Sequence, residues 1–308
     1  MRSVTEPLSV EQAADVLRRA AANGDRVAIE RPGGDVLVHT RYLNRVLEHE
    51  AGDLTATVEA GIRLSALNEQ LAEHGQMLAL DPPGDPSIGA AIAGDLFGPQ
   101  AYRYGRPRDL VLGVTLVLAD GTVASSGGKV VKNVAGYDLA KLVCGSRGRL
   151  GLIARASLRL HPLPPAARTL VVPLAEPGEA VALVQDLLHS PLVPSAVDLL
   201  WGGEESVLAI LFEGAEPAVA EQLERARGSL GGREDGEVWQ ASAARQIASR
   251  SRGSFPLGEL EPALGEVSDA LVRIGPTCFA YVRGAYEQAW SPLAERVRAE
   301  FDPAGVLA

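Results

Sequence analysis

Residues 129–153 read KVVKNVAGYDLAKLVCGSRGRLGLI, and this stretch is the most informative part of the chain. It sets four glycines among the apolar residues of a packed element: Gly136, Gly145, Gly148 and Gly151. Glycine in such a setting indicates that a ligand or another backbone segment comes close, because no side chain stands in the way. The stretch therefore predicts that a ligand or another backbone segment lies close to these glycines inside a folded domain.

The last three glycines are spaced G-x-x-G-x-x-G, which differs from the G-x-G-x-x-G fingerprint of classical dinucleotide-binding domains. That fingerprint follows a first strand and opens a helix. Here the glycines lie in mid-chain, before a strand predicted at 151–160. We therefore reject a Rossmann interpretation.

Composition limits the class of protein. With 308 residues the chain is long enough for two domains, and its net charge of −10 argues against binding to nucleic acid or to anionic membranes. The longest apolar run, 110–119, is half as long as a spanning helix needs, and the N-terminus has no apolar signal segment. We expect no direct membrane insertion and a cytoplasmic location. The two distant cysteines, Cys144 and Cys278, fit a reducing compartment.

Patterns of apolar residues predict the elements of the first half. A capping box at 9–12 opens a helix that ends near 23–24, and strands are expected at 27–30, 36–40 and 54–59. A helix at 64–73 and strands at 110–119 and 122–126 follow. Between them, residues 81–109 carry five glycines and five prolines, which predicts a long, rigid and functional loop.

The proline-rich segment 161–165 is a plausible domain boundary. Beyond it, strands at 169–174, 196–201 and 207–213 alternate with helices at 178–189 and 217–230. This β-α-β-β-α order suggests a split βαβ sandwich whose last strand is 238–240 or 277–283. A final helix is expected at 286–301.

Two clusters in the 81–109 segment carry candidate chemistry. Ser87, Ile88 and Gly89, with small residues after them, would let backbone amides approach a diphosphate, or they form a rigid loop that covers a sheet edge. The RYGRPRD run at 103–109 holds three arginines, which would bind a carboxylate substrate, meet an acidic partner or be solvated.

The runs KNVAGYD at 132–138 and G-S-x-G-x-L-G-x-I at 145–153 resemble the second signature of the vanillyl-alcohol-oxidase, or PCMH-type, FAD-binding family. The likeness is greatest to the E-subunit branch of bacterial glycolate oxidases, which often lacks the acidic residue that many relatives have in place of Arg147. Residues 82–90 resemble a P-x-x-x-x-[TS]-I-G-G loop in which Ala90 replaces the second glycine. Residues 104–113 and 301–308 resemble two further family elements.

The resemblance implies an α+β fold. An FAD-binding domain of two α/β subdomains would cover 1–165, a smaller ferredoxin-like α/β cap 166–285, and a helix at 286–308 would return to the first domain. It also implies a set of cofactor-binding residues: Gly33, Gly34, Pro83, Ser87, Ile88, Gly89, Gly94, Gly98, Tyr104, Gly145, Gly148, Gly151 and Ile153. No histidine or cysteine matches a covalent flavin attachment site, so FAD is expected to be non-covalent. The five histidines show no metal-ligand spacing, and no catalytic base can be named.

By the same resemblance, the chain is an FAD-binding subunit that joins a D-type flavin subunit and an iron–sulfur F-type subunit. Such a complex oxidises glycolate or a similar 2-hydroxy acid, and partners would bring the chain to the inner membrane. One departure favours an alternative. The family's first phosphate loop, R-G-G-G-T, is reduced here to the two glycines Gly33 and Gly34, so the chain would be a scaffold that has lost tight FAD binding. A stand-alone flavin dehydrogenase is a third possibility.

Overall fold

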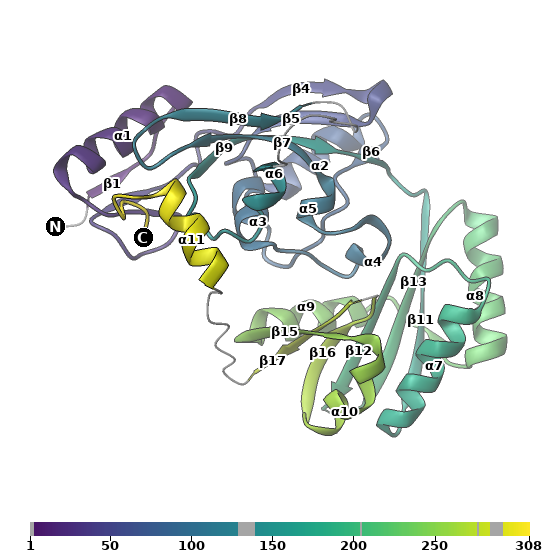
Figure 1. The fold of residues 1–308 in the computed structure, drawn as a ribbon. Coiled ribbons are helices and arrows are strands. Elements are labelled where there is room, and N and C mark those ends of the chain that lie inside the picture. Colours follow the sequence, from purple (N-terminus) through teal and green to yellow (C-terminus); the bar gives the residue numbers. More distant parts are fainter. Residues whose placement is uncertain (1–2, 129–138, 204, 276, 284–291) are drawn as a thin grey trace.

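The computed structural model describes residues 3–128, 139–203, 205–275, 277–283 and 292–308. Two sheet-based domains lie one above the other in Figure 1, and the C-terminal end of the chain lies at the first domain. The KNVAGYD run at 132–138 falls outside the described residues, so its role stays a prediction.

A small parallel sheet begins the first domain. Strands β1 (Ser3–Thr5), β3 (Val36–Val38) and β2 (Val27–Ile29) pair in that order. Helix α1 (Val10–Asn23) precedes β2; Ser9 caps its N-terminus and Gly24 its C-terminus, as the capping signals predicted. After helix α11 (Pro292–Phe301), the backbone N–H of Ala308 donates to the carbonyl of Val27 at 2.8 Å, so the C-terminal residues extend this sheet.

A five-stranded antiparallel sheet forms the second lobe of this domain. Its order is β4-β5-β9-β7-β8. The bounds are β4 Val46–Glu50, β5 Thr55–Glu59, β7 Val111–Val117, β8 Val123–Gly127 and β9 Leu152–Arg159. Helices α2 (Leu64–Ala72), α3 (Ile88–Gly94) and α6 (Leu139–Leu142) pack their apolar residues on one face of it. Next to η1 (Ala51–Asp53), the short strands β6 (Gln76–Met77) and β10 (His161–Pro162) pair at the border of the domain.

The segment 81–109 is not the irregular loop that its glycines and prolines predicted. It contains three short helices, α3, α4 (Ala101–Tyr104) and α5 (Pro107–Leu110). The side chain of Ser87 caps α3 by accepting from the amide of Ala90, and Pro107 begins α5 where a missing N–H costs nothing. Each helix has seven residues or fewer, too few for an apolar period to show in the sequence.

The cap is a seven-stranded antiparallel sheet in the order β14-β11-β13-β12-β16-β17-β15. Its first four strands in sequence have the spatial order of a ferredoxin-like fold, with the fourth strand beside the first. The elements are β11 Ala166–Leu174, α7 Pro177–His189, β12 Ala196–Gly202, β13 Ser206–Gly214, α8 Glu216–Leu230, β14 Arg233–Glu234, α9 Val238–Ala248, β15 Ser251–Pro256, η2 Leu257–Glu259, α10 Leu260–Gly265, β16 Asp269–Arg273 and β17 Thr277–Val282.

Alternating residues of the cap strands build two cores. Leu170, Val172 and their neighbours face α7, α8 and α10, whereas Val171 and its neighbours face α9, which lies between the cap sheet and the first domain (Figure 1). The α+β fold class with a ferredoxin-like cap is confirmed. One detail was wrong: residues 238–240 begin helix α9, and the expected fourth strand is the two-residue β14. Residues 277–282 do form a strand, β17, which extends the opposite edge together with β15 and β16.

Candidate functional site

A cavity of about 400 Å³ lies where three segments of the first domain meet. One segment is the turn after β2, the second is α3, and the third is the glycine-rich turn before β9. The lining residues are Ile29, Glu30, Arg31, Thr40, Gly89, Ala90, Ala93, Gly94, Leu96, Arg147, Gly148, Gly151 and Ile153. We call this cavity the first-domain pocket.

The turn after β2 is held in shape by Glu30. This residue has a left-handed backbone with φ of 58°, which is uncommon for a residue other than glycine. Its carboxylate accepts hydrogen bonds from the amide (2.6 Å) and hydroxyl (2.7 Å) of Thr40 and lies 3.1 Å from Nδ1 of His39. Burial acts to raise the pKa of Glu30, but the hydrogen bonds from Thr40 and His39 outweigh it and lower that pKa. Glu30 therefore stays ionised and fixes the first wall.

The second wall is the surface of α3. Its first amides are already used within the chain: Ile88 N donates to Ile62 O, Gly89 N to Ala60 O at 2.6 Å, and Ala90 N to the Ser87 hydroxyl. What α3 offers the pocket is therefore a smooth face of Gly89, Ala90, Ala93 and Gly94 against which a flat or narrow ligand can lie.

The third wall is the turn that contains Arg147 and Gly148. Both residues are left-handed, with φ of 54° and 77°. The amide of Arg147 donates to Ala93 O at 2.8 Å, and that of Gly145 to Ile92 O at 3.0 Å, so the turn is fastened to α3. A Cβ on Gly148 would stand 3.6 Å from Ile29 Cδ1, which places this turn next to the end of β2. The three walls form one connected unit.

Five of the predicted cofactor residues line this pocket: Gly89, Gly94, Gly148, Gly151 and Ile153. The others lie around it or farther away. Ser87 and Ile88 cap and anchor α3, while Gly145 belongs to the turn beside α3 without lining the pocket. Pro83 lines a second cavity described below, and the hydroxyl of Tyr104 donates to Glu213 in the cap at 3.4 Å.

Two of the predicted glycines, Gly34 and Gly98, are explained by close contacts within the chain, and a third, Gly33, has no such contact. A Cβ on Gly34 would lie 2.3 Å from the carbonyl oxygen of Arg26, and one on Gly98 would lie 2.1 Å from that of Asp81. Neither position has room for a larger residue, since real Cβ atoms do not come so close. Gly33 lies beside Ala308, 3.9 Å from its Cβ. Their roles as ligands of the cofactor stay predictions.

Sequence reasoning missed several lining residues, among them Thr40, Leu96 and the two arginines Arg31 and Arg147. No sequence motif marks Thr40 or Leu96 as a binding residue, because only the folding of the chain brings them to the pocket. Arg31 and Arg147 did have one, since each stands beside the glycines that mark a ligand-binding turn.

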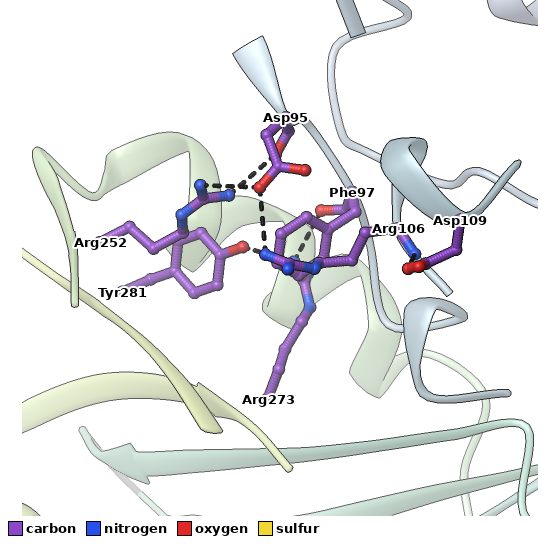
Figure 2. Close-up of polar contacts among 7 residues, drawn as sticks. All are labelled: Asp95, Phe97, Arg106, Asp109, Arg252, Arg273 and Tyr281. Atoms are coloured by element: carbon purple, nitrogen blue, oxygen red, sulfur yellow. Dashed lines mark hydrogen bonds and ion pairs between the residues drawn. The ribbon is translucent and has the colours of Figure 1, made fainter. Parts of the chain in front are cut away.

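The domain junction lies next to this pocket and is dense in charge. Figure 2 shows Asp95, at the end of α3, between Arg106 of the first domain and Arg252 of the cap, with both guanidinium groups 3.2 Å from Oδ2. The guanidinium of Arg252 also lies 5.1 Å from the ring centroid of Phe97. Nη1 of Arg273 donates to the carbonyl of Phe97 at 2.8 Å. These contacts couple the end of α3 to the cap sheet.

Two of the three arginines at 103–108 contact the cap. Arg103 donates to the hydroxyl of Ser195 at 3.1 Å and to Glu213 O at 3.2 Å. Arg106 pairs with Asp95 of its own domain, and its guanidinium lies 4.9 Å from the ring centroid of Phe279 in the cap. Arg108 is exposed.

A second cavity, of about 300 Å³, lies between the domains and is lined by Asp81, Pro83, Pro99, Gln100, Leu211, Trp239, Ala243, Gln246 and Arg273. Protein atoms surround most of Asp81, and the part of its side chain that stays accessible lines this cavity. Burial raises the pKa of Asp81 to about 7.

Within the described ranges, no group of histidine, cysteine and acidic residues is arranged to hold a metal ion. Across those same residues, no helix has the length and apolar character needed to cross a membrane. Both cysteines are free thiols, and burial raises the pKa of Cys278.

Comparison with known proteins identifies the first domain. Residues 2–127 match the family model described as an FAD binding domain. D-lactate dehydrogenase (cytochrome) 1 from mitochondria of Saccharomyces cerevisiae is 35% identical over 161 residues, which cover 52% of this chain and 27% of that protein. The glycolate oxidase subunit GlcD of Bacillus subtilis is 34% identical over 170 residues, which cover 54% of this chain and 36% of that protein. A solved alkyldihydroxyacetonephosphate synthase shares the fold, with a TM-score of 0.75 over 98% of this chain and 75% of that one at 17% identity.

The first domain therefore has two lobes with a pocket where they meet, and residues 2–127 of it match the FAD binding domain model. It is similar there to the dehydrogenase and oxidase subunits named above, and its cofactor is FAD. The chain spans only 27% and 36% of the length of the two curated relatives, so their activities are not transferred with the family.

Proposed function

We propose that this chain is the FAD-binding subunit of a complex that oxidises a small 2-hydroxy acid, with glycolate as the first candidate, to the 2-oxo acid. The first-domain pocket carries the proposal, because it joins the three segments that the sequence marked as cofactor-binding. The relatives favour the substrate class, since glycolate and D-lactate, which their names contain, are both 2-hydroxy acids.

The pocket residues suit an elongated cofactor with a charged centre and an apolar end. Ile29, Leu96 and Ile153 offer apolar surface that excludes water, and Arg31 and Arg147 offer positive charge. Non-covalent binding of FAD, which the sequence predicts, is part of the proposal. When bound, FAD supplies a hydride acceptor for the oxidation of an alcohol.

The scaffold alternative is less favoured. The turn after β2 is short, yet it still contributes Ile29, Glu30 and Arg31 to the pocket, and Glu30 is held rigidly by Thr40. A domain that had abandoned its cofactor would have no need of a strained, hydrogen-bonded turn at this place.

The partners belong to the proposal as well. A D-type flavin subunit and an iron–sulfur F-type subunit would complete the complex and carry electrons away. A cytoplasmic location, with attachment to the inner membrane through those partners, fits this assembly.

The test is a visible spectrum of the purified, desalted chain, followed by assembly with the D-type and F-type subunits and addition of glycolate or D-lactate. We expect a retained flavin band in the isolated chain, and bleaching of the flavin by one of the two acids in the assembled complex. A chain that stays colourless after incubation with FAD would eliminate the flavoprotein function and leave the scaffold. Bleaching by substrate in the isolated chain would instead favour a stand-alone dehydrogenase.

A further inference from the structure

We propose that Arg31 and Arg147 bind the diphosphate of FAD through their guanidinium groups and thereby replace the backbone amides that the shortened turn after β2 does not provide. The inference rests on the proposed FAD function and assigns the part of the pocket that holds the cofactor's charge. Arg31 and Arg147 come from segments more than a hundred residues apart, and both line the same cavity.

The charge around the pocket points to an anionic ligand. Burial lowers the pKa of Arg149, and the positive charges of Arg298, Arg31 and Arg147 lower it further, with Glu295 acting in the opposite direction. Arg298, Arg31 and Arg147 therefore lie close enough to Arg149 to repel its guanidinium group. A bound anion would relieve that repulsion.

The acid in the pocket does not neutralise this cluster. Both carboxylate oxygens of Glu30 are committed to Thr40 and His39, which fix the turn. In the part of the chain that the structure describes, the side chain of Arg147 has no ion pair or hydrogen-bond partner, and it is exposed. Its donors are available to a ligand.

Both arginines are placed by the fold. Nη2 of Arg31 donates to the backbone oxygen of Ala308 at 2.9 Å, so the C-terminal residues that pair with β2 hold the guanidinium group of this side chain in place. Arg147 sits in a left-handed turn fastened to α3, next to Gly148, whose missing side chain leaves room beside Ile29. The ligand would thus meet one guanidinium group that the chain already holds and a second that projects from a fixed turn.

The chemistry of the arginine side chain suits the role of the missing backbone amides. A guanidinium carries five N–H donors in a planar fork that fits phosphate oxygens, and it brings a full charge that a backbone amide lacks. Two such groups compensate for several amides. The expected consequence is FAD affinity that depends on these two side chains and on salt far more than a site built from amides would.

The experiment titrates FAD, ADP and riboflavin into the flavin-free full chain by calorimetry, for the wild type and for Arg31→Gln, Arg147→Gln and Arg227→Gln. Arg227 is exposed on α8 in the cap and serves as a control with the same change in net charge. We expect each pocket variant to weaken FAD and ADP by about tenfold or more, from the loss of a hydrogen bond to a charged group. Riboflavin, which has no phosphate, should bind all four proteins equally.

The outcomes separate the two claims. FAD that binds the wild type and both pocket variants as tightly as Arg227→Gln overturns the arginine assignment and leaves the FAD function standing. If ADP binds only when both arginines are present and FAD does not bind, the result supports the diphosphate site and overturns the flavin function. A wild type that binds neither ligand overturns both. Circular dichroism verifies folding, and Arg147→Gln carries the test if Arg31→Gln does not fold.

Discussion

Replacing Asp81 by asparagine should stabilise the protein, and by more as the pH rises. Burial raises the pKa of this carboxyl to about 7; the negative charges of Asp198 and Glu213 act in the same direction, while the amide of Gln100 and the charge of Arg273 oppose it. The carboxylate is thus a charge that folding places where water solvates it poorly. Asparagine keeps an oxygen to accept from the amide of Gln100 and never ionises.

The sign and size follow from linkage. The folded pKa of about 7 lies above the ordinary value of 3.8, so between these pH values the folded chain holds a proton that the unfolded chain has lost. The free energy of unfolding therefore falls with rising pH across this window because of Asp81, and it stays constant on this account above pH 7. The full difference is about three pH units, or at most about 4 kcal/mol.

Urea unfolding of the wild type, Asp81→Asn and Asp186→Asn at several pH values between 4 and 8 measures this effect. Asp186 is exposed on α7 and controls for the loss of one carboxylate. The stability difference between Asp81→Asn and the wild type should be small near pH 4, grow through the window and level off above pH 7, while Asp186→Asn shows no such trend. A difference that does not change with pH, or that shrinks as pH rises, would refute the assignment of an electrostatic penalty to Asp81.

Two further substitutions test the pocket turn and the domain junction. Gly34→Ala should destabilise the chain by more than about 3 kcal/mol or prevent folding, because its Cβ would lie 2.3 Å from the carbonyl oxygen of Arg26. The control, Gly33→Ala, should change the free energy of unfolding by less than about 1 kcal/mol. Equal effects of the two substitutions in urea unfolding would contradict the contact. Asp95→Asn should cost about 2–3 kcal/mol, because it leaves two partly buried arginines of the junction without their shared partner. The exposed pair of Glu221 with Arg225 gives the matched control, and Glu221→Gln should cost less than about 0.5 kcal/mol; similar losses in the two variants would show that the junction is no stronger than a surface pair.

The elements that sequence analysis found have strong local signals. Helix α1 has both of its caps and a buried apolar stripe, and strands such as β11 have long apolar runs. The elements it missed have none. Helices α4 and α5 have four residues each, and β14 has two exposed charged residues that pair only because β11 offers a free edge. Residues 238–240 have the apolar character of a strand, yet in the tertiary structure they form the first turn of helix α9.

The candidate site was predictable in part for the same reason. Glycine marks a close approach without naming what approaches, so Gly148 and Gly34 gave the same signal in the sequence. The structure separates them, because Gly148 faces the pocket and Gly34 faces the backbone of its own sheet. A motif that resembles a phosphate loop can therefore keep its glycines for folding and leave recognition to other groups.

The length of the turn after β2 illustrates this further. If only backbone amides are counted, the short turn lacks donors for a diphosphate, and that loss made a scaffold a reasonable alternative. Judged by charge, the same place holds Arg31, and the facing glycine-rich turn holds Arg147. A short turn on one segment and a positive charge on another are each unremarkable alone. Together they restore the attraction that a diphosphate needs, because electrostatic complementarity depends on the sum of charges at the site and not on which segment supplies them.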